Sequence, residues 1–180
     1  MMVDNSNDGT AIANMVVVEP GPRPSWRTKM KILIATDGSD YSAAAVEECC
    51  RMIIRPETAD ILIVSAFEDT YPITAEPFAI SAEYYQKFAD GLNELATTFN
   101  KTAEDAIRAK FLNTELKISS EVLRGAPDQQ IIEKAKEWKA DLIVVGSHGR
   151  GFWGRLLGSV SNGVVHHAPC SVLVVRKPGN

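Results

Sequence analysis

The sequence predicts an α/β protein in which helices cover both faces of a parallel sheet, and three observations carry this prediction. Short apolar runs recur along the chain, as expected of strands that are buried on both faces. Amphipathic segments with a three-to-four-residue apolar period separate these runs. Five runs alternate with four amphipathic segments, which is the order of strand–helix–strand units. The 180 residues suit one domain.

The first residues are polar and interrupted by prolines, so we expect a flexible N-terminal tail over 1–28 and a folded domain over 29–178. Within the tail, "MVVV" (15–18) is a candidate for an additional, weakly held strand.

The domain begins with "KILIAT" (31–36), a continuous apolar run that predicts a buried strand. The turn "DGSD" leads into a helix over 40–54, which ends before a proline. A second buried strand, "ADILIVSAF", follows over 59–67. Two prolines then indicate a long loop over 68–81.

Apolar residues at three-to-four-residue spacing predict one long helix over 82–111. Its length favours a kink or bulge near Gly91 or Asn100. In "LKISSEV" (116–122), apolar and polar residues alternate, which predicts a half-exposed strand at a sheet edge.

The last part of the chain repeats the strand–helix order. Pro127 stands at the start of a helix over 127–138, and "DLIVVG" (141–146) is the next buried strand. A helix over about 158–167 ends before Pro169. The final strand, "SVLVVR" (171–176), is expected at an apolar sheet edge, which invites pairing with a second copy of the chain.

Composition excludes several classes of protein. The net charge is −4, from 19 basic and 23 acidic residues, so no overall basic field indicates nucleic-acid binding. The three cysteines (Cys49, Cys50 and Cys170) form no disulfide framework, which suits a reducing compartment. No apolar run reaches the ~18 residues that cross a membrane. We therefore expect a cytoplasmic protein without nucleic-acid or membrane partners.

A ligand site is expected where the carboxyl ends of parallel strands meet, which directs attention to 36–40 and 146–161. The second segment contains G-x-G-x-x-G, but the acidic residue that holds a dinucleotide ribose is missing, because no Asp or Glu follows Asp141. It also resembles a Walker motif, but Arg155 and Leu156 replace the required Lys and Ser/Thr. Both interpretations are disfavoured.

A phosphate cradle explains the glycine-rich segment better. Gly146 and Gly149 follow a strand directly, and Gly158 and Ser159 open a helix whose N-terminus suits an anion. Ser161 adds a second hydroxyl. The 39 residues after Asp141 carry four cationic side chains and no acid. We assign this positive surplus to phosphate binding; the alternative is a short, strand-rich terminus that happens to lack acids.

Other polar residues near the two segments have alternative interpretations. We expect Asp37 to accept hydrogen bonds from ribose hydroxyls, with Asp40 as the helix N-cap, although either could cap the helix. His148 is either a phosphate or dimer contact or an exposed loop residue. His166 and His167 end a helix and are expected to be structural. They lack the ligand spacing of a zinc site with Cys170, so we predict no metal centre.

Three segments of the chain resemble the nucleotide-binding branch of the universal stress protein family: "KILIATDGSDYS", "VLRGAPDQQII" and "DLIVVGSHGRGFWGRLLGSVSNGVVHHAPCSVLVVR". The resemblance covers about 30–177. It implies a Rossmann-like three-layer sandwich, similar to adenine nucleotide alpha hydrolases, with a five-stranded parallel sheet of order 3-2-1-4-5 and four helices. It also implies a homodimer that pairs through the last strand.

The same resemblance implies the ligand and its contacts. The ligand would be ATP, or ADP or AMP, with Mg²⁺ as an optional companion. The residues implied in nucleotide binding are Ala35, Thr36, Asp37, Ala66, Gly146, His148, Gly149, Arg150, Gly158, Ser159, Val160 and Ser161. The family motif is G-x2-G-x9-G-[ST], whereas eight residues separate Gly149 from Gly158 here. This departure concerns the outer phosphates more than the adenosine.

The expected function is nucleotide-dependent regulation of a stress or energy response, through conformational change and contacts with a dimer mate or partner. No catalytic residue is assigned. The alternatives are a slow ATPase or nucleotide-dependent transferase, and an interaction module without nucleotide, which the intact glycines and Ser159 disfavour.

Overall fold

The computed structural model describes residues 14–16, 29–53, 56–68, 82–112, 114–149 and 157–177. The strands are β1 (Asn14–Val16), β2 (Met30–Ala35), β3 (Ala59–Phe67), β4 (Lys117–Arg124), β5 (Leu142–Gly146) and β6 (Ser171–Val175). The helices are α1 (Asp40–Met52), α2 (Ala82–Lys110), α3 (Pro127–Trp138) and α4 (Ser159–His167), with a short 3-10 helix at Pro56–Thr58.

The sheet has the order β1-β6-β5-β2-β3-β4. All neighbours from β2 to β6 run parallel, so these five strands have the predicted order 3-2-1-4-5 when they are numbered along the chain. The half-exposed strand β4 lies at one edge, as its alternating sequence predicts. The order reverses between β2 and β5, and this places the site.

The other edge of the sheet differs from the prediction. β6 is not an edge strand, because β1 pairs with it in antiparallel orientation. The added strand begins one residue before the candidate "MVVV" segment (15–18) and overlaps its first two residues. Val172, Leu173 and Val174 of β6 are the residues opposite it.

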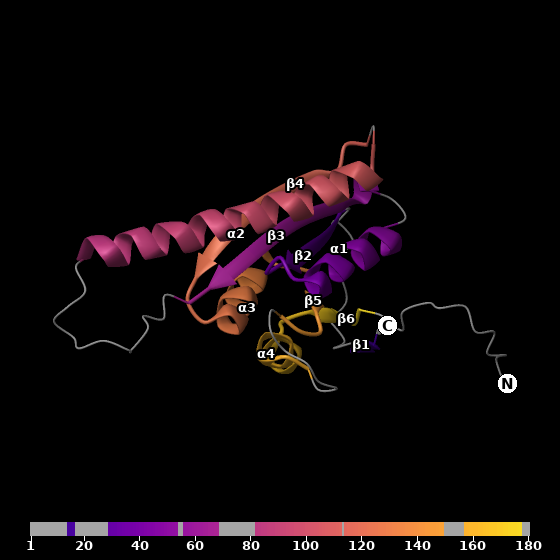
Figure 1. The fold of residues 1–180 in the computed structure, drawn as a ribbon. Helices are drawn as coiled ribbons and strands as arrows, with labels where there is room; N and C mark the ends of the chain where they lie inside the picture. The colour runs from indigo at the N-terminus through magenta and orange to yellow at the C-terminus, as the bar shows by residue number, and fades with distance from the viewer. Residues whose placement is uncertain are drawn as a thin grey trace, which may run out of the picture.

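Two helices cover each face of the sheet. Figure 1 shows α1 and α2 on one face and α3 and α4 on the other. Successive residues of β2 point to opposite faces, so that Ile32 and Ile34 pack with α1 and α2 whereas Leu33 packs with α3 and α4. Burying each such side chain contributes about 1.5–3 kcal/mol, which explains the uninterrupted apolar runs.

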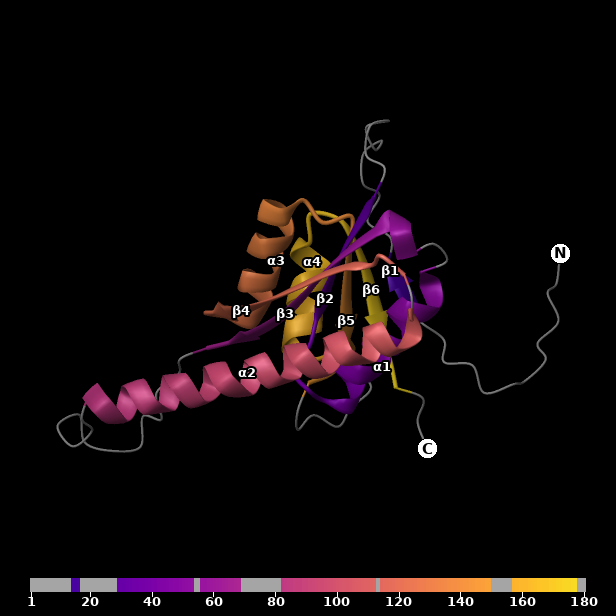
Figure 2. The ribbon, with the colours of Figure 1, turned by 90° about the horizontal axis from the view of Figure 1, so that it is seen from above.

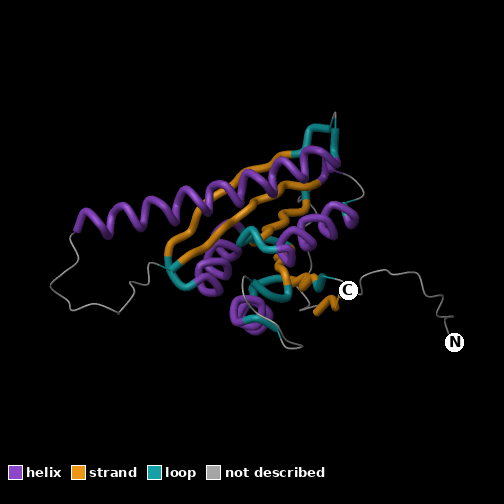
Figure 3. Tube along the Cα trace, viewed as in Figure 1, coloured by secondary structure: helices purple, strands orange, loops and turns teal. Residues whose placement is uncertain are grey.

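Helix α2 runs from Ala82 to Lys110 without interruption, so the predicted kink or bulge is absent from it. A Cβ atom at Gly91 would meet no other atom within 4 Å, and Asn100 directs its side-chain amide into the sheet layer and leaves the helix backbone intact. Figure 2 shows that the N-terminal part of α2 extends past the sheet. Figure 3 shows the rest of it lying along the strands.

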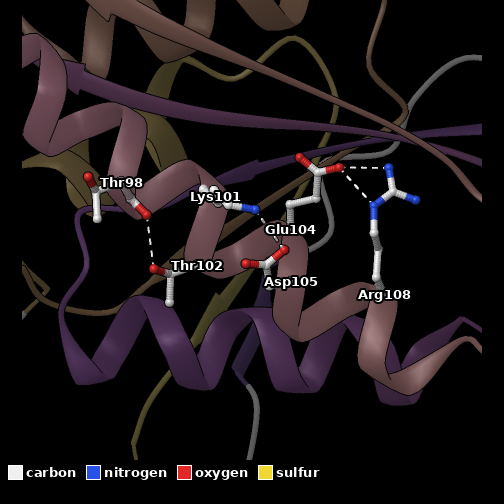
Figure 4. Close-up of polar contacts among 6 residues, drawn as sticks. All are labelled: Thr98, Lys101, Thr102, Glu104, Asp105 and Arg108. Carbon is white, nitrogen blue, oxygen red and sulfur yellow. Dashed lines mark hydrogen bonds and ion pairs between the residues drawn. The ribbon is translucent and has the colours of Figure 1, made fainter.

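The outer face of α2 carries local polar contacts. Lys101 pairs with Asp105 and Arg108 with Glu104, each one turn apart, and the Thr102 hydroxyl donates to the Thr98 carbonyl (Figure 4). Such i, i+4 pairs support an exposed helix modestly.

Candidate functional site

A cavity of about 350 Å³ opens at the carboxyl ends of β2 and β5, where the strand order reverses. We call it the switch-point cavity. Its lining comes from the ends of β2, β3 and β5 and from the first turns of α1, α3 and α4. Ligands of open α/β sheets bind at such points, and the volume lies in the range of small-molecule sites.

The switch-point cavity gathers every sequence-predicted site residue that the structure describes. These are Ala35, Thr36, Asp37, Ala66, Gly146, His148, Gly149, Gly158, Ser159, Val160 and Ser161. Arg150 lies outside the described residues, as do the basic residue Arg155 and the loop residues 69–81.

Sequence reasoning missed five residues of the lining, which are Ser42, Val64, Pro127, Ile131 and Val145. Pro127 and Ile131 are four residues apart on α3, and such spacing identifies one helix face. The sequence contains no local signal that this face lies over the cavity, because that depends on how α3 packs against the sheet.

The turn after β5 is fastened to its surroundings through Ser147. Its backbone N–H donates to the Val175 carbonyl at 2.8 Å, and its carbonyl accepts from the Gly158 N–H at 2.8 Å. The Ser161 hydroxyl lies 2.9 Å from the Ser147 carbonyl and 3.0 Å from the Gly158 carbonyl. These bonds fix the N-terminus of α4 against the end of β5.

Helix α4 presents its N-terminal amides to the cavity. Gly158 is the N-cap residue and contributes no side-chain capping bond. The first N–H groups of a helix have no partner within the helix, and here they belong to Ser159, Val160 and Ser161, which all line the cavity. This end of the cavity therefore suits an anionic group.

At two positions of the lining, a neighbouring group lies so close to the backbone that only glycine fits. A Cβ atom at Gly146 would lie 2.7 Å from the backbone carbon of Tyr41, so this glycine lets α1 approach β5. A Cβ atom at Gly149 would lie 2.9 Å from Oδ2 of Asp37. Gly149 thus brings the backbone of the glycine-rich turn against the carboxylate at the end of β2.

The cap of α1 differs from the prediction. Ser39 is the N-cap residue, and its hydroxyl oxygen accepts from the Ser42 N–H at 3.2 Å. Asp37 in turn accepts from the Ser39 N–H at 3.0 Å and from the Ser39 hydroxyl at 2.6 Å, both through Oδ1. Oδ1 of Asp37 is thereby anchored, and Oδ2 lies on the side of Gly149.

Asp40, the residue expected to cap α1, lies on the surface. Its carboxylate accepts from the Lys177 ammonium group at 2.6 Å, and this hydrogen bond lowers the pKa of Asp40. Lys177 belongs to the acid-free C-terminal segment that we assigned to phosphate. The ion pair and its place outside the cavity lining correct that interpretation for Lys177.

His148 is buried, with 7% of its surface exposed, which excludes the interpretation as an exposed loop residue. Its ring lies 5.1 Å from the Tyr41 ring, and Nδ1 is 3.0 Å from the Ser147 hydroxyl. Of the described lining residues, Asp37 carries a carboxylate and His148 an imidazole ring.

The described residues contain no cluster of metal ligands, and burial disfavours the thiolate form of two of their cysteines. They contain no group of three or more His, Cys, Asp or Glu side chains that could hold a metal ion. His166 and His167 place Nδ1 at 2.8 and 3.0 Å from carbonyls one turn earlier in α4. Burial raises the pKa of Cys49 to about 12 and that of Cys170 to about 11.

The fold and the cavity together define a doubly wound, Rossmann-like α/β domain with a ligand-sized cavity at its switch point. The model of the universal stress protein family matches residues 29–176, and the chain belongs to this family. None of the described helices has the length and apolar character of a membrane span.

Individual relatives agree with this assignment. The universal stress protein MJ0531 of Methanocaldococcus jannaschii is 35% identical over 150 residues, which are 82% of each chain. The solved structure of MJ0577 covers 85% of this chain and 99% of its own, with a TM-score of 0.68 and 21% identity, and shows the shared fold. A universal stress protein solved in complex with cAMP is 26% identical, with a TM-score of 0.57, and covers 84% of this chain and 99% of its own.

Proposed function

We propose that this protein binds an adenine nucleotide in the switch-point cavity, and that nucleotide occupancy regulates a response to stress or energy state. The observation that carries the proposal is the order of three chemically different surfaces in one cavity. Along the strand order, the apolar lining lies at β3, the Asp37 carboxylate at the end of β2 and the α4 N-terminus beside the end of β5, which is the order of base, ribose and phosphate. The family member in complex with cAMP supports the ligand class.

The apolar part of the cavity would hold the adenine. Val64 and Ala66 of β3 and Pro127 and Ile131 of α3 contribute its apolar lining. The Ala66 backbone and the neighbouring Ala35–Thr36 strand end would contact the base edge. A flat aromatic base between apolar walls loses contact with water, which favours binding.

The polar part would hold the ribose and phosphates. Oδ2 of Asp37 would accept a hydrogen bond from a ribose hydroxyl, while Oδ1 stays anchored by Ser39. The backbone at Gly149 and the first amides of α4 would bind the phosphates, with the Ser159 hydroxyl as a further donor. Arg150, placed by the sequence beside Gly149, would supply positive charge.

We propose ATP as the ligand, with ADP and AMP as competitors, because the connection between Gly149 and Gly158 is one residue shorter than the family motif. A shorter connection limits how far the two phosphate-binding elements can separate around a triphosphate. Mg²⁺ would arrive with the triphosphate. Asp37 is the carboxylate among the described lining residues, and Ser39 already occupies one of its oxygens.

Regulation would act through the link between β5 and α4. Bound phosphate would bridge Gly149 and Ser159, which lie at the two ends of the connection over 150–157. The bridge would favour one conformation of that connection and thereby change a contact surface for a partner or dimer mate. ATP hydrolysis or group transfer is the alternative, with Asp37 and His148 as the titratable groups at the cavity.

Calorimetric titration with ATP, ADP, AMP and cAMP tests the proposal. Gly149→Ala should weaken nucleotide binding at least about tenfold, because its methyl group displaces the Asp37 carboxylate and blocks the phosphate-binding backbone. Gly91→Ala is the matched control, since its methyl group enters open space on α2. Absence of measurable affinity for all four ligands in the unaltered protein would refute the proposal.

Two further assignments rest on the sequence and the family. We propose a cytoplasmic location, for which the three cysteines, free and buried, are the support. We also propose a homodimer that pairs through β6, for which the apolar strand is the support. In the monomer, β1 already pairs with this edge of β6.

A further inference from the structure

The outer edge of β6 carries a defined set of backbone groups. The Val175 carbonyl points to β5, where it accepts from the Ser147 N–H. Backbone groups of a strand alternate in direction, so Leu173 also faces β5, whereas the N–H and C=O groups of Val172 and Val174 point outward. These four outward groups make up the hydrogen-bonding edge of β6.

Strand β1 covers these four groups. Asn14 lies opposite Val174, and Val16 lies opposite Val172. In an antiparallel pair, residues opposite an outward-facing residue turn their own backbone groups towards it. Asn14 and Val16 therefore face β6, and Met15 directs its N–H away from it. The N–H and C=O groups of Asn14 and Val16 therefore match the four outward groups of Val172 and Val174.

A second copy of β6 would occupy the same place. If two β6 strands ran antiparallel with Leu173 opposite Leu173, Val172 of the second copy would lie opposite Val174 of the first. Asn14, Met15 and Val16 stand where Val172, Leu173 and Val174 of that copy would stand. Both pairings satisfy the same backbone groups, so they exclude each other.

Nothing else on β6 protects its edge. Its side chains from Val172 to Val175 are 0–3% exposed and point into the two core layers, so no charged side chain or proline of this strand blocks a neighbour. A three-residue strand gives few hydrogen bonds, whereas the pairing of two five-residue strands gives more. The cover is therefore displaceable.

We propose that β1 is an internal competitor of dimerisation: it occupies the β6 edge and raises the concentration at which two copies of the chain pair through that edge. The N-terminal segment thereby adjusts the assembly state, and anything that binds or removes it favours the dimer. This inference is independent of the nucleotide proposal, since β6 does not line the switch-point cavity.

The test compares full-length variants by sedimentation equilibrium. Val16→Pro removes an N–H that faces β6 and should lower the dimer dissociation constant at least about tenfold, since several backbone bonds of β1 are lost together. Met15→Pro is the matched control, because the N–H it removes points away from β6. It should leave the constant within about twofold of that of the unaltered protein.

A second variant identifies the surface. Val174→Pro removes an outward N–H that both pairings need but keeps the bonds of β6 to β5. Added to Val16→Pro, it should abolish the dimer, while circular dichroism reports an intact fold. Hydrogen exchange gives an independent measurement: the Val172 and Val174 amides should exchange faster in Val16→Pro at concentrations where the protein is monomeric. Equal dissociation constants in all variants, or a dimer that survives Val174→Pro, would overturn the proposal.

Discussion

Oδ1 of Asn100 lies 2.8 Å from the hydroxyl oxygen of Ser65, and both side chains are buried between α2 and the sheet. The Ser65 hydroxyl is also 2.7 Å from the Thr36 carbonyl, and the amide nitrogen of Asn100 donates to the Glu121 carbonyl at 2.8 Å. Asn100 thus links α2 directly to β3 and β4, and through Ser65 to the end of β2. Thr36 lines the switch-point cavity, so this network supports the floor of the site.

Replacing Asn100 by Ala should destabilise the fold by about 1–3 kcal/mol, because the buried Asn100 side chain loses its hydrogen bonds to the Ser65 hydroxyl and the Glu121 carbonyl. Urea denaturation measures the change. The matched control is Thr97→Ala on the exposed side of α2, for which we expect a change within about 0.5 kcal/mol. Equal stability of the two variants would show that the buried network contributes no net stability.

Asp37→Asn should weaken the binding of adenosine, AMP and ATP by the same factor, about tenfold or more. The amide keeps an oxygen for Ser39 but replaces the ionised acceptor that faces the ribose, and charge-assisted hydrogen bonds contribute about 1.5–3 kcal/mol. Calorimetry measures the three affinities. Asp40→Asn is the neighbouring control and should bind as the unaltered protein does. A loss confined to ATP would place Asp37 at the phosphates and contradict the assignment.

The features that local physics determines were predictable from the sequence. The bounds of α3 agree with the prediction because Pro127 fixes the start of the helix and Lys139, in the left-handed conformation, ends it. β3 agrees because nine residues of an apolar run leave little choice. The strand order and the ligand class were implied by the family resemblance, and no periodicity determines either of them.

Features that depend on packing between distant segments were not predictable. The length of α2 favoured a kink near Gly91 or Asn100, but the polar side chain of Asn100 finds its partner in Ser65, 35 residues away, and the helix continues without interruption. Ser39 caps α1 although Asp40 is an equally good capping residue by type. The choice follows from Asp37, which holds the Ser39 hydroxyl. The apolar "MVVV" segment indicated an added strand, but nothing in it identified β6 as the strand with which it pairs.

The ion pair of Asp40 with Lys177 predicts a pH effect of defined sign. Lys177 lowers the pKa of Asp40 from its ordinary value of 3.8, first through a hydrogen bond and then through its charge. A lowered pKa in the folded state means that the contribution of the ion pair to stability is present above the unfolded pKa and is lost as the pH falls through the folded pKa.

In Lys177→Met the Asp40 pKa should return to about 3.8, as measured by NMR titration of the carboxyl carbon. High salt should shift the Asp40 pKa of the unaltered protein in the same direction, because both groups are exposed. An Asp40 pKa that Lys177→Met leaves unchanged would show that the pair does not form in solution.

The three cysteines should resist alkylation as long as the protein is folded. Burial raises the pKa of Cys49 to about 12 and that of Cys170 to about 11, and it also raises that of Cys50, so very little reactive thiolate exists at pH 8. Iodoacetamide labelling followed by mass spectrometry should therefore give no modified peptide in the native protein within the time that labels all three cysteines in urea. Rapid native labelling of Cys49 would mean that the α1 layer opens easily, since this thiol is 1% exposed against the sheet.

The same labelling measurement on Asn100→Ala tests whether the Asn100 network also protects Cys49. If the Asn100 network holds α2 against the sheet, its loss should increase the labelling rate of Cys49, because α2 packs beside α1 over the same core cluster.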